Sequence, residues 1–264
     1  MKLYVINLDL YPERFFRLNE IFAQQGLTPR RIRALDMKNI SDTDYKNLTR
    51  KSFWPERMTR GEIACFLSHR TALQQLAEEQ EAYGAVFEDD VILSNNAHLF
   101  LKNYFWIPSG VDLVKLETQG KKVWLGHSIK NVNNFSLGRL KSSHILAAAY
   151  IVSKKSALYL IKKMEDVCAP FDHFLFNLDY GIANKLKIYQ LDPAIARQSN
   201  VRSTLEYERA QYRDERKKKR TMMGILQREF CRLGRRSYIG LRGIKINCFS
   251  EDKWKKIDFD SNPG

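Results

Sequence analysis

Apolar and polar positions near the start of the chain follow first a strand pattern, then a helical one, then a strand pattern again. Residues 3–8 are an apolar run, and Pro12 precedes apolar residues at helical spacing up to Gly26. Proline suits the first turn of a helix, and glycine suits the position after its end. A second apolar run covers residues 31–35. This β-α-β order predicts an α/β fold with a Rossmann-type, mostly parallel central sheet and flanking helices.

The next clear signal is a helix start at Thr59. Glu62 follows three residues later, which predicts a capping box, and the helix is expected to run to about residue 80. Residues 36–58 are polar and irregular and predict a loop over the site. Glu62, Cys65 and His69 share one helix face. A helix surface packed against the loop is favoured there over a Cys-His-Glu metal site.

The rest of the pattern predicts further strands and helices in alternation. In order, we expect a strand over residues 85–93, a helix and turn over 94–110, a strand over 111–116, an open segment or β-hairpin over 117–143, a strand over 145–152, a helix capped by Ser153, a helix over 173–185 and a strand over 187–191.

Three consecutive carboxylates, Glu88, Asp89 and Asp90, interrupt the apolar strand over residues 85–93. Buried charges need a partner, and oxygen ligands suit Mg²⁺ or Mn²⁺. An acidic turn is the alternative interpretation. On extended backbone Glu88 and Asp90 point the same way and Asp89 points the other way. A sharp turn would spoil this alternation, and Asp89 would then be the ligand.

Other polar residues fall where the ends of elements are predicted. Asn7, Asp9 and Arg14 follow the first strand, where ligands bind in parallel sheets, although turn chemistry would also account for them. Asp172 occupies the N-cap position of the predicted helix 173–185, and Asp179 lies two turns further on. A capping role and a catalytic carboxylate remain open for Asp172.

Charge is concentrated late in the chain. The 264 residues carry a net charge of +14, and 17 Lys and Arg against 7 Asp and Glu fall between residues 202 and 256. We expect a catalytic domain over residues 1–200 and a basic, helical C-terminal segment over 201–264. Its arginines are interleaved with apolar residues, which is typical of contact with an anionic membrane or of a helical cap with a solvated face. They are Arg228, Arg232, Arg235, Arg236 and Arg242.

Composition limits the location and the class. A hydrophobic content of 44% excludes a disordered chain, and no apolar stretch reaches the length of a membrane span. The four cysteines are far apart without metal-ligand spacing, which is typical of reduced, cytosolic thiols. We expect a cytoplasmic protein with at most peripheral membrane contact. No nucleic-acid-binding motif is present, so no nucleic acid is expected as a partner.

Several motifs together resemble glycosyltransferase family 25, the bacterial lipooligosaccharide galactosyltransferases. The resemblance covers roughly residues 1–200, with the motifs in the family's order. They are Val5–Asp9 with Arg14, Thr59–His69, Phe87–Val91, Ala149–Ser153, and Pro193 with Gln198.

This resemblance implies a GT-A-like fold, a nucleotide-sugar donor (most often UDP-galactose), a divalent cation (Mn²⁺ or Mg²⁺) and inversion at the anomeric carbon. It implies hexose transfer to a lipooligosaccharide acceptor at the cytoplasmic face of the inner membrane, whose anionic surface the basic segment would contact. A glucosyltransferase of the same pathway is the alternative, followed by a non-catalytic glycolipid- or nucleic-acid-binding protein.

Site residues follow from this resemblance and from position. Glu88 and Asp90 match the outer acids of the family's Asp-x-Asp-type signature and are the expected metal ligands, with His173 or Gln198 as a third. Asp172 is the first choice of catalytic base and Asp179 the second. The expected nucleotide-sugar contacts are Asn7, Asp9, Arg14, Glu62, His69, Asp89 and Gln198.

Overall fold

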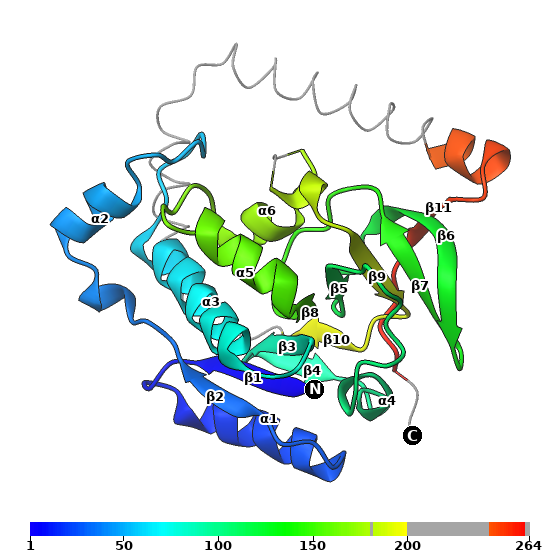
Figure 1. Cartoon of the computed structure of the whole chain (residues 1–264), viewed down its shortest axis with the longest axis horizontal. Coiled ribbons are helices and arrows are strands. Elements are labelled where there is room, and N and C mark those ends of the chain that lie inside the picture. Colours follow the sequence, from blue (N-terminus) through cyan, green and yellow to red (C-terminus); the bar gives the residue numbers. More distant parts are fainter. Residues whose placement is uncertain (180–181, 200–242, 262–264) are drawn as a thin grey trace.

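The computed structural model describes residues 1–179, 182–199 and 243–261. Within these ranges one large sheet carries helices on both faces, and a two-stranded ribbon lies beside it (Figure 1). The strands are β1 (Lys2–Asn7), β2 (Arg30–Arg33), β3 (Tyr83–Glu88), β4 (Val91–Leu93), β5 (Leu113–Lys115), β6 (Lys122–Val132), β7 (Phe135–Leu140), β8 (Ala149–Ser153), β9 (Ile188–Asp192), β10 (Ala196–Gln198) and β11 (Lys253–Lys256). The helices are α1 (Pro12–Gln24), α2 (Asp42–Leu48), α3 (Arg60–Glu78), α4 (His98–Leu101), α5 (Lys154–Lys163) and α6 (Phe171–Phe176), with 3₁₀ turns η1 (Met37–Asn39) and η2 (Ala183–Lys185).

The main sheet is mixed. Its nine described strands lie in the order β11-β6-β7-β9-β5-β8-β3-β1-β2. β8, β7 and β11 oppose the other six, so most strands share one direction, although only the β1–β2, β1–β3 and β5–β9 pairs are parallel. The predicted β-α-β opening is confirmed. The antiparallel insertions of β8 and β7 did not follow from the sequence pattern.

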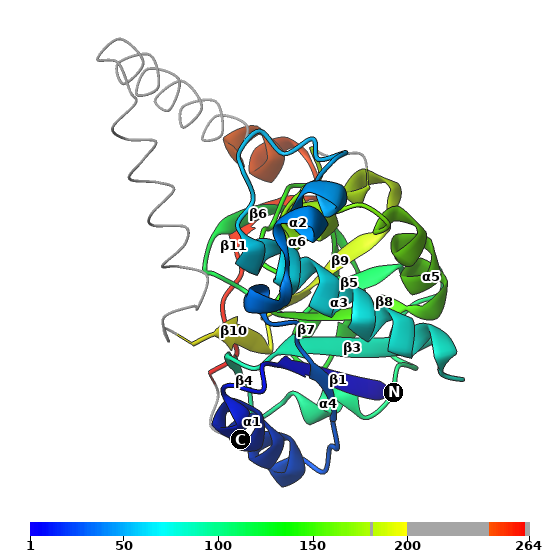
Figure 2. The same cartoon turned by 90° about the vertical axis from the view of Figure 1, so that its left-hand side faces the viewer.

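Two apolar cores cover the two faces of the sheet. Alternate residues of each buried strand point to opposite faces, so Tyr4 joins one core and Val5 the other. The first core packs against α3, α5 and α6, for example through Phe66 and Phe171. The second packs against α1 and α4, for example through Phe22. Figure 2 shows these two helix layers on either side of the strands. The layers leave free the edge of the sheet where β1 and β3 end.

Three predicted elements differ from the observed ones. Residues 36–58 contain η1 and α2 instead of an irregular loop, and α4 is a single short turn within 94–110. The expected strand over 145–152 begins only at Ala149, because Leu146 has a positive φ of 84°, which a strand does not allow.

The helix predicted over 173–185 is also wrong. Helix α6 starts at Phe171 and ends at Phe176, and Asn177 is already extended, with ψ 105°. Pro170 is the N-cap residue, so Asp172 is not a cap. Its Oδ1 accepts a hydrogen bond of 2.9 Å from the main-chain nitrogen of His173.

The end of the described chain returns to the sheet. Residues 243–249 form a helix, and β11 pairs with β6 in place of the helix expected there. Asp260 accepts hydrogen bonds from the side chains of Ser94 and Asn96. The arginine-rich stretch from Arg228 to Arg242 lies outside the described residues. Among the residues described, no helix is both long and apolar enough to cross a membrane.

Candidate active site

Asn7 links the ends of β1 and β3. These strands are parallel neighbours, so their carboxyl ends meet at one edge of the sheet. Asn7 is buried, and its Nδ2 donates a hydrogen bond of 2.6 Å to Oδ2 of Asp89. Its Oδ1 accepts one of 2.8 Å from Nε of Arg31. The amide thus fixes the acidic turn against the first strand.

Asp89 points toward α1 and two of its arginines. Arg14 lies 3.7 Å from the Asp89 carboxylate, and Arg17 donates to the main-chain oxygen of Asp89 at 3.2 Å. Burial raises the pKa of Asp89, while the hydrogen bond from Asn7 and the charge of Arg14 oppose that rise. Asp89 is therefore engaged with the first βα unit, and its predicted contact with the nucleotide sugar stays a prediction.

Asp90 has the most perturbed carboxyl of the acidic run. Its pKa is raised from 3.8 to about 7, first by burial and then by the neighbouring charges of Glu88, Asp89 and Glu117, while the charge of Arg14 opposes the rise. Among the described atoms, its buried Oδ1 has no hydrogen-bond partner. A buried carboxylate oxygen without a donor is costly, and a bound cation would satisfy it.

Glu88, the last residue of β3, is held from two sides. Nε2 of Gln198 donates to its Oε2 at 3.3 Å, and Nε2 of His69 lies 3.2 Å from its Oε1. Burial lowers the pKa of His69 to about 3, so its imidazole is neutral. Nδ1 of His69 lies 3.1 Å from the hydroxyl of Tyr150. We assign the ring proton to Nε2, because the Glu88 carboxylate only accepts and the tyrosine hydroxyl can donate.

A cavity of about 360 Å³ opens beside this turn. One wall is acidic, with Glu88, Asp89 and Asp90, and Arg14 stands near them. The remaining wall is largely apolar and comes from the ends of β1 and β2 and from α3. It consists of Ile6, Leu8, Leu10, Tyr11, Ala34, Leu35, Asp36, Met37, Lys38, Gly61, Ala64, Cys65, Ser68 and His69. The residues expected to form a loop over the site therefore contribute to it through η1.

The donor set at this edge fits a hard divalent cation. Glu88 and Asp90 supply carboxylate oxygens beside the cavity, and Oδ1 of Asp90 lacks a partner in the described structure. Oxygen-rich sets of this kind suit Mg²⁺ or Mn²⁺. Cys65, His69 and Glu88 form a further group whose ligand atoms lie within 4.8 Å of one another. The Cys-His-Glu site that the sequence disfavoured involved Glu62, whereas this group contains Glu88.

A second cavity, of about 720 Å³, lies on the far side of Gln198. Gln198 lines it and also contacts Glu88, which lines the first cavity. Its other walls include Leu146, Arg197 and Phe259. Gln198 thus connects the wall of the second cavity to the carboxylate of Glu88.

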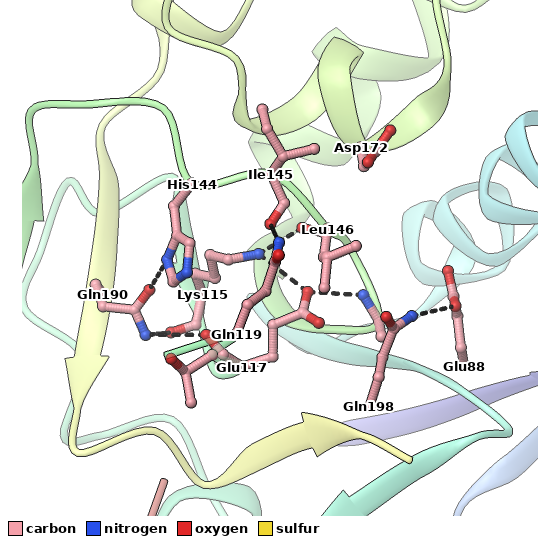
Figure 3. Close-up of polar contacts among 12 residues, drawn as sticks. Glu88, Lys115, Glu117, Gln119, His144, Ile145, Leu146, Asp172, Gln190 and Gln198 are labelled. Carbon is pink, nitrogen blue, oxygen red and sulfur yellow. Dashed lines mark hydrogen bonds and ion pairs between the residues drawn. The ribbon is translucent and has the colours of Figure 1, made fainter. Parts of the chain in front are cut away.

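Sequence reasoning missed a buried ion pair behind the carboxylates, shown in Figure 3. Nζ of Lys115 lies 2.9 Å from Oε1 of Glu117, and both side chains are fully buried. Burial raises the pKa of Glu117 and lowers that of Lys115, and each charge opposes the shift of the other. The signal was present: two opposite charges two residues apart share one face of an apolar strand.

The remaining predicted residues are more scattered. Asp9 forms ion pairs with Arg31 and Arg33 outside the 360 Å³ cavity. Glu62 completes the predicted capping box with Thr59, accepting from its main-chain nitrogen at 2.8 Å.

The two candidate bases differ in setting. Asp172 is half-buried and close enough to His69 and Lys115 for its charge to raise the pKa of both, whereas Asp179 is exposed. His173, the alternative third metal ligand, packs against the ring of Trp54 with 4.4 Å between centroids.

Comparison with known protein families shows the family to which the sequence belongs. The sequence profile described as "Glycosyltransferase family 25 (LPS biosynthesis protein)" matches residues 1–175. The chain belongs to glycosyltransferase family 25. The family motifs recognised in the sequence therefore mark an enzyme, and the carboxylate edge described above lies within the matched region.

Curated proteins similar to this glycosyltransferase come from Haemophilus and Neisseria. It is 34% identical over 220 residues to the lipooligosaccharide biosynthesis protein lex-1 of Haemophilus influenzae, covering 75% of this chain and 68% of the relative. It is 28% identical to the lacto-N-neotetraose biosynthesis glycosyltransferase LgtE of Neisseria gonorrhoeae, covering 89% and 91%. A solved glycosyltransferase involved in glycosylation of the major capsid of PBCV-1 aligns with a TM-score of 0.44 and 9% identity over 80% of this chain and 98% of that one.

Proposed function

We propose that this glycosyltransferase has a GT-A-like catalytic domain and transfers galactose from UDP-galactose to a lipooligosaccharide acceptor, with inversion at the anomeric carbon and with bound Mn²⁺ or Mg²⁺. The names of its relatives support the acceptor class, since they describe lipooligosaccharide and lacto-N-neotetraose biosynthesis. The carboxylate cluster around Asp90 carries the metal part of the proposal, because its buried Oδ1 lacks a partner among the described atoms.

Each group at the sheet edge receives a role in this reaction. Glu88 and Asp90 would hold the cation, which would supply a Lewis acid for the charge of the departing diphosphate. Asn7 and Arg14 hold Asp89 at the wall of the 360 Å³ cavity, which is our proposed nucleotide-sugar site. The 720 Å³ cavity that Gln198 lines is our proposed acceptor site.

The acceptor hydroxyl must lose a proton as it attacks. We propose that Asp172 accepts this proton as the general base. Asp172 is half-buried, and its charge acts to raise the pKa of His69 and of Lys115. Inversion follows when the hydroxyl attacks the anomeric carbon from the face opposite the leaving UDP. The exposed Asp179 remains the second choice.

A donor panel tests the proposal directly. UDP release is measured with UDP-galactose, UDP-glucose and UDP-N-acetylhexosamines, with Mn²⁺ and with EDTA, and the product linkage is read by NMR. We expect turnover with UDP-galactose that requires the cation and a product of inverted configuration. Faster turnover with UDP-glucose would make the chain the glucosyltransferase instead, because a few pocket contacts decide between such epimers.

Variants of the acidic turn test the metal role. Asp90→Ala is expected to abolish transfer while the circular dichroism spectrum stays unchanged. Asp166→Ala is a suitable control, because Asp166 forms a surface ion pair with Lys51. Near-normal activity of Asp90→Ala would contradict the proposed role of Asp90 as a metal ligand.

We also propose that the basic stretch between residues 202 and 256 contacts anionic lipid at the cytoplasmic face of the inner membrane. Its support is the excess of 17 basic over 7 acidic residues. Juxtamembrane basic clusters contribute about 1 kcal/mol per residue near an anionic surface. Co-sedimentation with phosphatidylglycerol vesicles, lost at high salt and absent with phosphatidylcholine, is the expected result. Equal sedimentation with both lipids would contradict it.

A further inference from the structure

Residues 144–148 connect the region after β7 to β8 without regular secondary structure, yet side chains hold them at several points (Figure 3). Lys115 donates to the main-chain oxygen of Leu146, and Gln119 donates to that of Ile145 at 2.7 Å. Oε1 of Glu117 accepts from the main-chain nitrogen of Ala148 at 2.8 Å. Of the side chains that hold this segment, Lys115, Glu117 and Gln119 belong to β5 or to the four positions that follow it, and Gln190 of β9 contacts the ring of His144 at 2.9 Å.

The segment contains a strained residue. Leu146 has φ 84°, a left-handed conformation that costs a residue with a side chain of order 1 kcal/mol or more. Its carbonyl is the one bound by the buried ammonium of Lys115. Strain of this kind persists only where the surroundings over-determine it. The ammonium offers the strained carbonyl a charged donor in a dry setting, which strengthens the hydrogen bond.

The same segment reaches the acidic turn. The main-chain oxygen of Ala148 accepts a hydrogen bond of 2.8 Å from the main-chain nitrogen of Glu88. Ala148 is therefore held by Glu117 on one side and holds Glu88 on the other. This chain of contacts joins the fully buried ion pair to one of the two proposed metal ligands.

We infer that the Lys115–Glu117 ion pair is a positioning device that keeps residues 144–148 in their strained path and thereby fixes the Glu88 carboxylate for metal binding. The inference rests on the proposed metal role of Glu88. Both residues act through the main chain of residues 146–148. Replacing a buried ion pair by apolar residues is often neutral for stability. We infer that the contribution of the pair here is to hold the main chain of residues 146–148, and through it Glu88, in position.

The test compares metal affinity in variants that keep the charge balance. Lys115→Met with Glu117→Gln removes both charges and leaves an amide oxygen to accept from Ala148. Mn²⁺ affinity, measured by electron paramagnetic resonance, is expected to weaken about tenfold, as is usual for residues that support a metal ligand. UDP binding without metal stays unchanged. Asp260→Asn is the matched control, a buried carboxylate far along the chain, and should keep the wild-type Mn²⁺ affinity.

Rescue separates positioning from general destabilisation. Adding Leu146→Gly to the double variant should restore Mn²⁺ affinity to within about threefold of the wild type, because glycine adopts a positive φ without strain. Leu146→Ala should not restore it. Wild-type metal affinity in the double variant, or equal effects of glycine and alanine, would overturn the inference.

Two further measurements cover failure of the variants or of the metal role. If the double variant does not fold, Gln119→Leu is the substitute, because it releases only the carbonyl of Ile145. It should also weaken Mn²⁺ binding, and unchanged binding would contradict the inference.

If the wild type itself binds no Mn²⁺, the proposed metal role fails. Hydrogen exchange over residues 144–149 and 87–89 then decides: faster exchange in the variants supports positioning, and unchanged exchange refutes it.

Discussion

Asn7 donates a hydrogen bond of 2.6 Å to Asp89, a residue 82 positions further along the chain. Asn7→Ala removes this hydrogen bond from the Asp89 carboxylate, which keeps its ion pair with Arg14 at 3.7 Å. We expect a loss of about 1–3 kcal/mol in unfolding free energy, the usual cost of a buried group left without its partner.

Urea titration measures that loss, and calorimetry should show weaker UDP binding. Asn7→Asp, which sets a second carboxylate against Asp89, should be worse on both counts. Equal stability of wild type and Asn7→Ala would mean that water replaces the amide without cost.

The raised pKa of Asp90 predicts that the stability of the fold depends on pH. Its folded-state pKa of about 7 lies above the ordinary value of 3.8, so the charged form destabilises the fold. The destabilisation is absent below pH 3.8, grows as the pH rises to 7 and is complete above it. In EDTA, Asp90→Asn should therefore melt higher than wild type at pH 8, by about 2–4 °C for each kcal/mol of relieved repulsion.

The melting temperatures of Asp90→Asn and wild type should converge near pH 4. Mn²⁺ should bind wild type more weakly as the pH falls below 7, because the cation then competes with a proton. A melting-temperature difference that does not change with pH would refute the assignment.

Asp172 and Asp179 allow a paired comparison, since one is half-buried near His69 and the other is exposed. Asp172→Asn should lower kcat by about 10²–10⁴-fold, the usual contribution of a general base. It should leave UDP-galactose binding intact. Asp179→Asn should retain nearly full turnover. The reverse pattern would transfer the role of base to Asp179.

Although Glu62 is among the expected nucleotide-sugar contacts, we predict that its main role is the capping box with Thr59. Glu62→Gln should keep both stability and kcat/KM, because glutamine serves equally well at this position of the box. Thr59→Ala should cost about 1 kcal/mol in stability without changing kcat. A tenfold loss of kcat/KM in Glu62→Gln, measured on a folded variant, would place its carboxylate on the nucleotide sugar.

Cys65 offers a chemical probe of the 360 Å³ cavity, whose wall it forms. Alkylation by N-ethylmaleimide should inactivate the enzyme, and saturating UDP should slow the inactivation. Cys65→Ser should resist the reagent, whereas Cys248→Ser, which removes an exposed cysteine, should stay sensitive. Inactivation that UDP does not slow would locate the nucleotide elsewhere.

The sequence predicted best what neighbouring residues decide. The capping box of Thr59 and Glu62 spans four positions. The β1-α1-β2 opening can be read from the spacing of apolar residues, with Pro12 at the start of the helix and Gly26 after its end. Both are local effects of backbone satisfaction and amphipathicity. The acidic edge was also foreseeable, because parallel strands carry their ligands at one end.

What the sequence did not reveal depends on distant partners or on backbone conformation. Glu117 meets Ala148 across 31 residues, and no local pattern signals that contact. An apolar run over 145–152 looks like a strand because hydrophobicity does not report the φ of Leu146. A capping role stayed open for Asp172 because helical periodicity does not show that Pro170 is the N-cap residue. The roles of the predicted site residues stay predictions.

Strand β11 changes how the basic stretch can be studied. Because residues 253–256 pair with β6 and Asp260 binds Ser94, cutting the chain after residue 200 would remove an edge of the sheet. A shortened protein must instead excise residues internally and rejoin the two ends. The upstream end is fastened to the active site, with Ser199 donating to the main-chain oxygen of Asp90 at 2.8 Å. Such an excision must therefore keep Ser199, because its main-chain hydrogen bond reaches the acidic turn.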